Sequence, residues 1–124
     1  MINLKNDHRE IRRGDIFWHL FDNTIMPVLV VQNDKGNQYS TNTIVVKMSS
    51  SKAVAEKSVR IPTIIEIPSS DIMFKNGCKL DDVGYVLASD IKTIPKDSLQ
   101  HFIGVLKEDA FESVNKALKI SLGI

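Results

Sequence analysis

The sequence has few of the residues that cross-link or anchor a small protein. Its 124 residues include a single cysteine, Cys78, so we expect no disulfide within the chain and no cysteine metal cluster. No apolar run is long enough to span a bilayer, and the first residues are polar and charged. We therefore expect a cytoplasmic protein with no membrane partner, whose core forms without a metal or cofactor.

An excess of charge is also missing. The formal net charge is +1, which argues against a protein that coats nucleic acid through bulk electrostatics but leaves a local basic groove open. Hydrophobic residues make up 43% of the chain and charged residues 25%, as is typical of globular proteins. The length predicts a single domain over residues 1–124.

The clearest structural signal is the stretch PVLVVQND, from Pro27 to Asp34. Its apolar run Val28–Val31 predicts a strand that is buried on both faces. The polar residues that follow predict a turn, and Gly36 is expected to supply the positive φ of a tight return. A second strand is then expected over residues 43–48, so that the two form a hairpin.

Four more short β-rich runs predict strands: Ile16–Leu20, Thr63–Ile67, Tyr85–Ala88 and Ile91–Ile94. The last two runs are either one bent strand or two separate strands. The connections between them are short and polar. They are predicted to be a turn at Asp22 and Asn23, a loop or single helical turn over 52–57, and a helical turn from Ser69 into Phe74.

The end of the chain changes to helical spacing. Leu99, Phe102, Ile103 and Leu106 would share one face of a helix over residues 95–106. A second helix is predicted to end at Gly123, because Phe111, Val114, Leu118 and Leu122 form a stripe. The expected architecture is mainly β: five or six strands curled into a small barrel or twisted antiparallel sheet, with helices packed on one side.

Five segments, in order and with compatible spacing, resemble the MazF/PemK/Kid family of bacterial toxins: RRGDIFW (12–18), PVLVVQNDKGNQYSTNTIVV (27–46), RIPTIIEI (60–67), DIKTI (90–94) and NKALKISL (115–122). Members of this family cleave single-stranded RNA without a metal, and an antitoxin neutralises them. The resemblance implies an SH3-like barrel with appended helices, related to the CcdB toxins and usually assembled as a homodimer. It also implies an antitoxin peptide or protein as partner and single-stranded RNA as substrate.

The resemblance also places the catalytic positions. The family's arginine, which directly precedes the PVLV segment, falls on Met26, its threonine falls on Ser49, and its acidic residue falls on Ser89. In the family's reaction a ribose 2′-hydroxyl attacks the adjacent phosphate, which requires a base, an acid and a group that stabilises the developing charge. A thioether can supply none of these, whereas Ser49 keeps a hydroxyl. Asp90 follows Ser89, but in a strand it points to the opposite face.

Other residues are candidates for the missing functions. His19 has a side chain that can act as acid or base near neutral pH, and Lys47 or Lys52 can bring a cation to the site. The segment before Met26 is also several residues shorter than the loop that closes over RNA in the family. The candidate RNA-binding residues are Asn33, Lys47, Lys52, Arg12 and Arg13. Each also has a structural explanation, such as a turn residue, a surface charge or a hydrogen-bonded strand residue.

Three functions remain open from the sequence. The first is an endoribonuclease toxin that acts through Ser49 and a relocated cation. The second is a dimer that keeps the barrel, has lost the chemistry and binds a protein or nucleic acid. The third is a toxin that poisons a protein target, as CcdB toxins do. The sequence favours a toxin-family protein whose catalysis is weakened at Met26.

Overall fold

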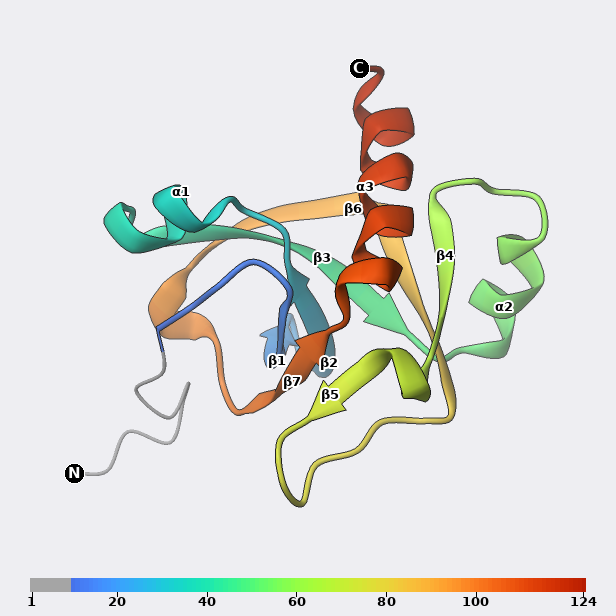
Figure 1. The fold of residues 1–124 in the computed structure, drawn as a ribbon. Helices are drawn as coiled ribbons and strands as arrows, with labels where there is room; N and C mark the ends of the chain where they lie inside the picture. Colours follow the sequence, from blue (N-terminus) through green and yellow to red (C-terminus); the bar gives the residue numbers. More distant parts are fainter. Residues whose placement is uncertain (1–9) are drawn as a thin grey trace.

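The computed structural model describes residues 10–124, whose strands form one antiparallel sheet that curls into a nearly closed barrel (Figure 1). The strand order is β4-β6-β3-β2-β1-β7-β5. The seven strands are β1 Asp15–Phe21, β2 Thr24–Val30, β3 Asn42–Ser49, β4 Ile64–Pro68, β5 Ile72–Phe74, β6 Val83–Pro95 and β7 Phe102–Leu106. The predicted barrel class is confirmed, although the sequence suggested five or six strands.

Three helices accompany the sheet: α1 Asp34–Tyr39, α2 Lys52–Ser58 and α3 Glu108–Leu122. In Figure 1, α1 and α2 lie at opposite ends of β3, and α3 rises across the sheet beside β6 and β4. Two 3₁₀ turns, Ser69–Asp71 and Lys96–Ser98, complete the described chain. No helix within residues 10–124 is long and apolar enough to cross a membrane.

The β1–β2 hairpin has a two-residue turn. Its ladder continues to the last pair, Phe21 opposite Thr24, so that only Asp22 and Asn23 lie outside it. Asp22 has a φ of 53°, which is the left-handed conformation that such turns require and that aspartate tolerates. The predicted turn at these two residues is therefore confirmed.

The second half of β2 is buried on both faces, as predicted for Val28 to Val30, whereas Thr24 and Ile25 at its start are exposed. Val28, Leu29 and Val30 have no exposed surface, and their side chains alternate between two apolar clusters. Leu29 belongs to a cluster under α3, together with Val46. Val28 and Val30 belong to a second cluster with Phe17.

The return from β2 to β3 differs from the prediction. Gly36 lies inside α1 rather than at a turn with positive φ; in the described chain the glycines with positive φ are Gly14, Gly77 and Gly123. The side chain of Asn33 begins the helix, because its Oδ1 accepts a hydrogen bond from the Gly36 amide at 2.7 Å. A short capped helix thus replaces the tight turn.

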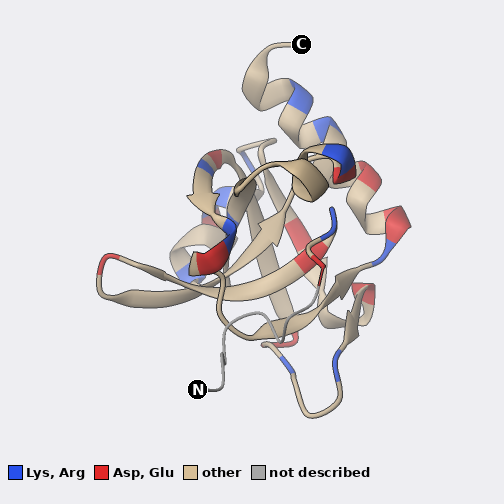
Figure 2. Ribbon diagram, turned by 90° about the vertical axis from the view of Figure 1, so that its left-hand side faces the viewer, with Lys and Arg blue, Asp and Glu red and all other residues tan. Residues whose placement is uncertain are grey.

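Two helical predictions are wrong. Residues 102–106 form strand β7 between β1 and β5, and Ile72–Phe74 form β5 rather than continuing the turn at Ser69–Asp71. The prediction for α3 is confirmed, and Gly123 ends this helix with a φ of 71°. Residues 52–58 form the seven-residue helix α2, which is more regular than the loop or single helical turn expected there. Figure 2 shows acidic residues where α3 begins and basic residues toward its end, the arrangement that the helix dipole favours.

Strand β6 is one bent strand. Val46 of β3 pairs with Ile91, but the next residue, Lys47, pairs with Leu87, so residues 88–90 bulge out of this ladder. Such bulges bend a strand and redirect its side chains. This bulge contains Ser89 and Asp90, two residues that the sequence analysis considered for the site.

Candidate functional site

The candidate site lies where β2 and β3 separate. Their pairing ends at Val28 opposite Lys47. Continued by two more residues, the same register would place Met26 opposite Ser49. Instead the strands part, and both residues line a groove of about 520 Å³. The structure therefore brings together the two positions that the resemblance identified.

Apolar side chains dominate the groove. Trp18 and Pro27, which are cross-strand partners, lie on one wall, and Met48 and Ile67 belong to the other strands that line it. The complete lining is Trp18, Thr24, Ile25, Met26, Pro27, Met48, Ser49, Ser50, Ser51, Ile67, Ile72, Lys79, Leu80, Asp81 and Gly84. An apolar surface with a few polar groups at its edge is typical of a pocket that receives apolar groups.

The charges at the groove cancel. Lys79 and Asp81, from the loop between β5 and β6, contribute one charge of each sign. Within residues 10–124, no arginine and no histidine lines the groove. No pattern in the sequence marks Lys79, Asp81 or Trp18 as lining residues, because the approach of this loop to the β1–β2 hairpin depends on the closed barrel. The serine hydroxyls of residues 49–51 are the other polar groups of the second wall.

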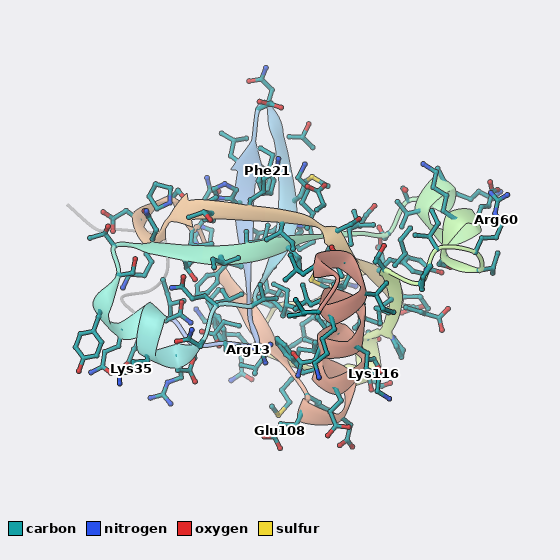
Figure 3. All side chains as sticks on the ribbon, turned by 90° about the horizontal axis from the view of Figure 1, so that it is seen from above. Arg13, Phe21, Lys35, Arg60, Glu108 and Lys116 are labelled. Carbon is teal, nitrogen blue, oxygen red and sulfur yellow. The ribbon has the colours of Figure 1, made fainter. Side chains whose placement is uncertain are left out.

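His19 lies on the opposite face of the hairpin from Trp18. It is 7% exposed, its Nδ1 lies 3.1 Å from the carbonyl oxygen of Ser98, and its ring packs edge-on against Phe21 at 4.5 Å between centroids. Figure 3 shows Phe21 on the hairpin where it projects past β3 and β6. His19 is thus held by a backbone carbonyl and an aromatic ring rather than exposed in the groove.

Lys47 is on the same face of the sheet as His19. Cross-strand partners share a face: Lys47 pairs with Val28, and His19 pairs with Met26. Val28 and Met26 are two residues apart on β2, so their side chains also share that face. Its Nζ lies 3.5 Å from Oδ2 of Asp90 and 4.6 Å from the centroid of the Phe21 ring. The ammonium is therefore engaged by a carboxylate and an aromatic face.

The remaining predicted positions lie apart from the groove lining. Ser89 is exposed in the β6 bulge, and Lys52 is exposed at the start of α2, where Oγ of Ser51 accepts from the Val54 amide. Asn33 caps α1. Arg12 pairs with Glu10 at 3.5 Å, with both side chains well exposed.

Arg13 holds three elements together. Its Nε donates to the Val31 carbonyl at 3.0 Å, its Nη2 donates to Oδ1 of Asn115 at 2.5 Å, and its guanidinium carbon lies 4.0 Å from the centroid of the Phe111 ring. Its backbone amide also donates to Asp34. Figure 3 shows Arg13 between α1, marked by Lys35, and α3, marked by Lys116. Burial lowers the pKa of Arg13, while the Asp34 carboxylate acts in the opposite direction.

We expect Arg13→Gln to lower the free energy of unfolding by about 2 kcal/mol, because it removes hydrogen bonds and a cation–π contact from a half-buried position. Urea denaturation followed by circular dichroism measures this change. Arg12→Gln is the matched control, since its side chain is 63% exposed, and it should change stability by less than about 0.5 kcal/mol. Equal effects of the two substitutions would contradict a structural role specific to Arg13.

A metal-based site has no support in the described chain. No group of three or more histidine, cysteine, aspartate or glutamate side chains that could hold an ion occurs within residues 10–124. The arrangement offers instead an apolar groove with hydroxyl groups, and beside it a lysine that is paired with a carboxylate.

Comparison with known proteins settles the family. The model of the PemK-like, MazF-like toxins of type II toxin–antitoxin systems matches residues 12–122. The chain belongs to the PemK/MazF toxin family. It is 33% identical to endoribonuclease MazF of Staphylococcus saprophyticus over 123 residues, which cover 92% of both chains. The family resemblance seen in the sequence is therefore confirmed.

Solved structures support the PemK/MazF fold. An endoribonuclease from a mycobacterial species, in complex with its cognate antitoxin, matches with a TM-score of 0.72 at 24% identity, over 92% of this chain and 96% of its own. MazF in a MazE–MazF complex from Deinococcus radiodurans matches with a TM-score of 0.66 at 17% identity, over 94% and 98%. At these identities the matches establish the barrel with its C-terminal helix, and no more.

Proposed function

We propose that this protein is a cytoplasmic, homodimeric member of the toxin family that binds a segment of an antitoxin in its groove, and that it cleaves RNA very slowly or not at all. The observation that supports this most is the groove itself. It is apolar, its charges balance, and within the described chain it contains no guanidinium or imidazole at the family's catalytic positions.

The electrostatics favour a peptide over RNA. Single-stranded RNA binds to grooves that carry several basic side chains, because neutralising phosphates supplies much of the affinity. Here Lys79 is offset by Asp81. Large apolar side chains of a partner can instead pack against Trp18, Ile25 and Pro27, which supplies hydrophobic free energy without requiring charge.

The catalytic part is tested by incubating the purified protein with long single-stranded RNA at neutral pH in EDTA. We expect cleavage at least about a hundredfold slower than that by Staphylococcus saprophyticus MazF in a parallel reaction, because the charge-stabilising group is missing. A comparable rate would overturn the proposal and favour the alternative of an endoribonuclease that acts through Ser49 and a relocated cation.

The binding part has an intrinsic probe. Trp18 is the only tryptophan of the chain and lines the groove, so its fluorescence reports whether the groove is occupied. The product of the gene next to this one, if it is an antitoxin, should shift that emission in a saturable titration. Ile25→Lys, which places a charge at an exposed position of the groove lining, should weaken the interaction. If the partner binds saturably without changing the Trp18 emission, and binds the variant with the same affinity, its binding site lies outside the groove.

A further inference from the structure

Asp90 occupies an unusual place relative to the catalytic positions. Its carboxylate reaches Lys47 from the β6 bulge, at 3.5 Å from Nζ. Within this ladder Lys47 is two residues from Ser49, so the two side chains lie on the same face and their Cα atoms are about 7 Å apart. Met48, between them, is buried in the core on the other face.

Met26 belongs to the same face. It pairs with His19, and it lies two residues from Val28, which pairs with Lys47. His19, Met26, Lys47 and Ser49 therefore lie on one face of the sheet, opposite Trp18 and Met48, and His19 is buried there. Met26 and Ser49 also line the groove, because β2 and β3 part at these two residues. The cation of this face lies beside the positions where the family performs its chemistry.

The surroundings of Lys47 are suited to a nucleotide. Its ammonium lies over the ring of Phe21, and that ring packs against His19. A cation next to a partly exposed aromatic ring is a combination with which proteins bind single-stranded nucleic acid, because the cation contacts a phosphate and the ring stacks on a base. Phe21 is partly exposed, whereas His19 is buried behind it and supports its ring. The side chains of Lys47 and Asp90 are 22% and 35% exposed, so solvent reaches both.

The carboxylate of Asp90 competes for this cation. A carboxylate and a phosphate are both anionic acceptors for an ammonium. Because Asp90 is fixed in the same molecule, it competes at a high effective concentration. Its own charge also repels a nearby phosphate. Without Asp90, Lys47 would be a half-buried, unpaired cation on the face that carries Met26 and Ser49.

We infer that Asp90 is a specificity-determining residue: by pairing with Lys47 beside Phe21 and His19, it excludes single-stranded RNA from this face of the protein. The inference deepens the proposed function, on which it rests, because it accounts for weak RNA binding separately from slow cleavage. It assigns to Lys47 the role of a phosphate contact that is blocked in the present chain.

The test measures RNA affinity rather than cleavage. Fluorescence anisotropy with a labelled single-stranded RNA of about ten nucleotides, a length in the range that small binding domains cover, gives the dissociation constant. We expect Asp90→Asn to bind about tenfold more tightly than the unmodified protein, with a steeper dependence on salt, because one repulsive charge is removed and one cation is released. The double variant Lys47→Gln, Asp90→Asn should lose the gain.

Two controls make the result specific. Glu66→Gln removes an exposed carboxylate from the edge strand β4 and should leave RNA affinity unchanged. Asp90→Ser repeats the test if Asp90→Asn does not fold, as judged by its thermal unfolding curve. Unchanged affinity in the folded Asp90 variant, or a gain that survives the Lys47→Gln change, would overturn the inference.

The same assay separates RNA from an acidic protein segment. A labelled oligoglutamate peptide presents carboxylates to Lys47 but has no bases to stack on Phe21. A gain for this peptide and none for RNA would overturn the assignment to RNA. These outcomes are independent of the proposed function, which is decided by the cleavage rate of the unmodified protein and by groove occupancy at Trp18.

Discussion

Met26→Arg is expected to raise the rate of RNA cleavage by about a hundredfold to a thousandfold, the range over which enzymes lose activity when one charge-stabilising group is removed. Met26 lines the groove with Ser49. An arginine here would start from the position that the sequence resemblance assigns to the family's arginine. The rate is measured with long single-stranded RNA in EDTA, where we expect the unmodified protein to cleave near background.

Two companion variants show whether the gain comes from the guanidinium. Met26→Gln has a polar side chain of similar length without a charge and should give no gain. Adding Ser49→Ala to Met26→Arg should reduce the new activity, because it removes the hydroxyl on the other side of the split. If Met26→Arg gives no increase while the fold is intact, the missing arginine does not by itself account for the slow cleavage that we propose.

Phe17→Ala is expected to have the largest effect on stability, with a loss of about 3–5 kcal/mol in the free energy of unfolding. Phe17 has no exposed surface, and its ring packs edge-on against Phe102 at 5.4 Å between centroids. Removing the ring leaves a cavity in the second apolar cluster, next to Val28 and Val30. Since small domains unfold at a cost of about 5–15 kcal/mol, a large part of the stability would be lost.

Urea denaturation followed by circular dichroism measures this loss. Tyr39→Ala is the matched control, because it also removes an aromatic ring but from a side chain that is 75% exposed. It should change the free energy of unfolding by less than about 0.5 kcal/mol. A comparably small effect of Phe17→Ala would mean that the barrel closes over the lost ring at little cost.

The elements that the sequence predicts best are those whose pattern is set by burial alone. β2 is apolar on both faces because both faces contact a core, and α3 has one apolar stripe because one face does. In both cases the spacing of apolar residues within the segment is sufficient to predict the element. The barrel class follows from such strands together with one terminal helix.

Strand β7 shows where local pattern fails. Its apolar residues are also spaced as on a helix, and only its neighbours decide between the two structures. Gly104 identifies them: a Cβ there would come within 2.6 Å of the Met73 carbonyl oxygen on β5, so the close approach of the two strands requires glycine. A partner strand about thirty residues away cannot be inferred from spacing.

The same limit applies to the site. The resemblance identified Met26 and Ser49, and the structure brings them to one groove. The resemblance could not show that the β6 bulge turns Asp90 toward Lys47. Nor could it show that Arg13 is engaged by Val31 and Asn115, because these contacts join residues 18 and 102 positions apart.

The short β1–β2 hairpin affects the entropy of binding. Because its ladder is paired as far as Phe21 and Thr24, this wall of the groove has almost no free backbone to order when a ligand arrives. A wall of this kind is preorganised, so binding forgoes the contacts that a closing loop adds but also avoids the entropic cost of ordering one. Association with this groove should therefore resemble the docking of two rigid surfaces more than the closing of a lid.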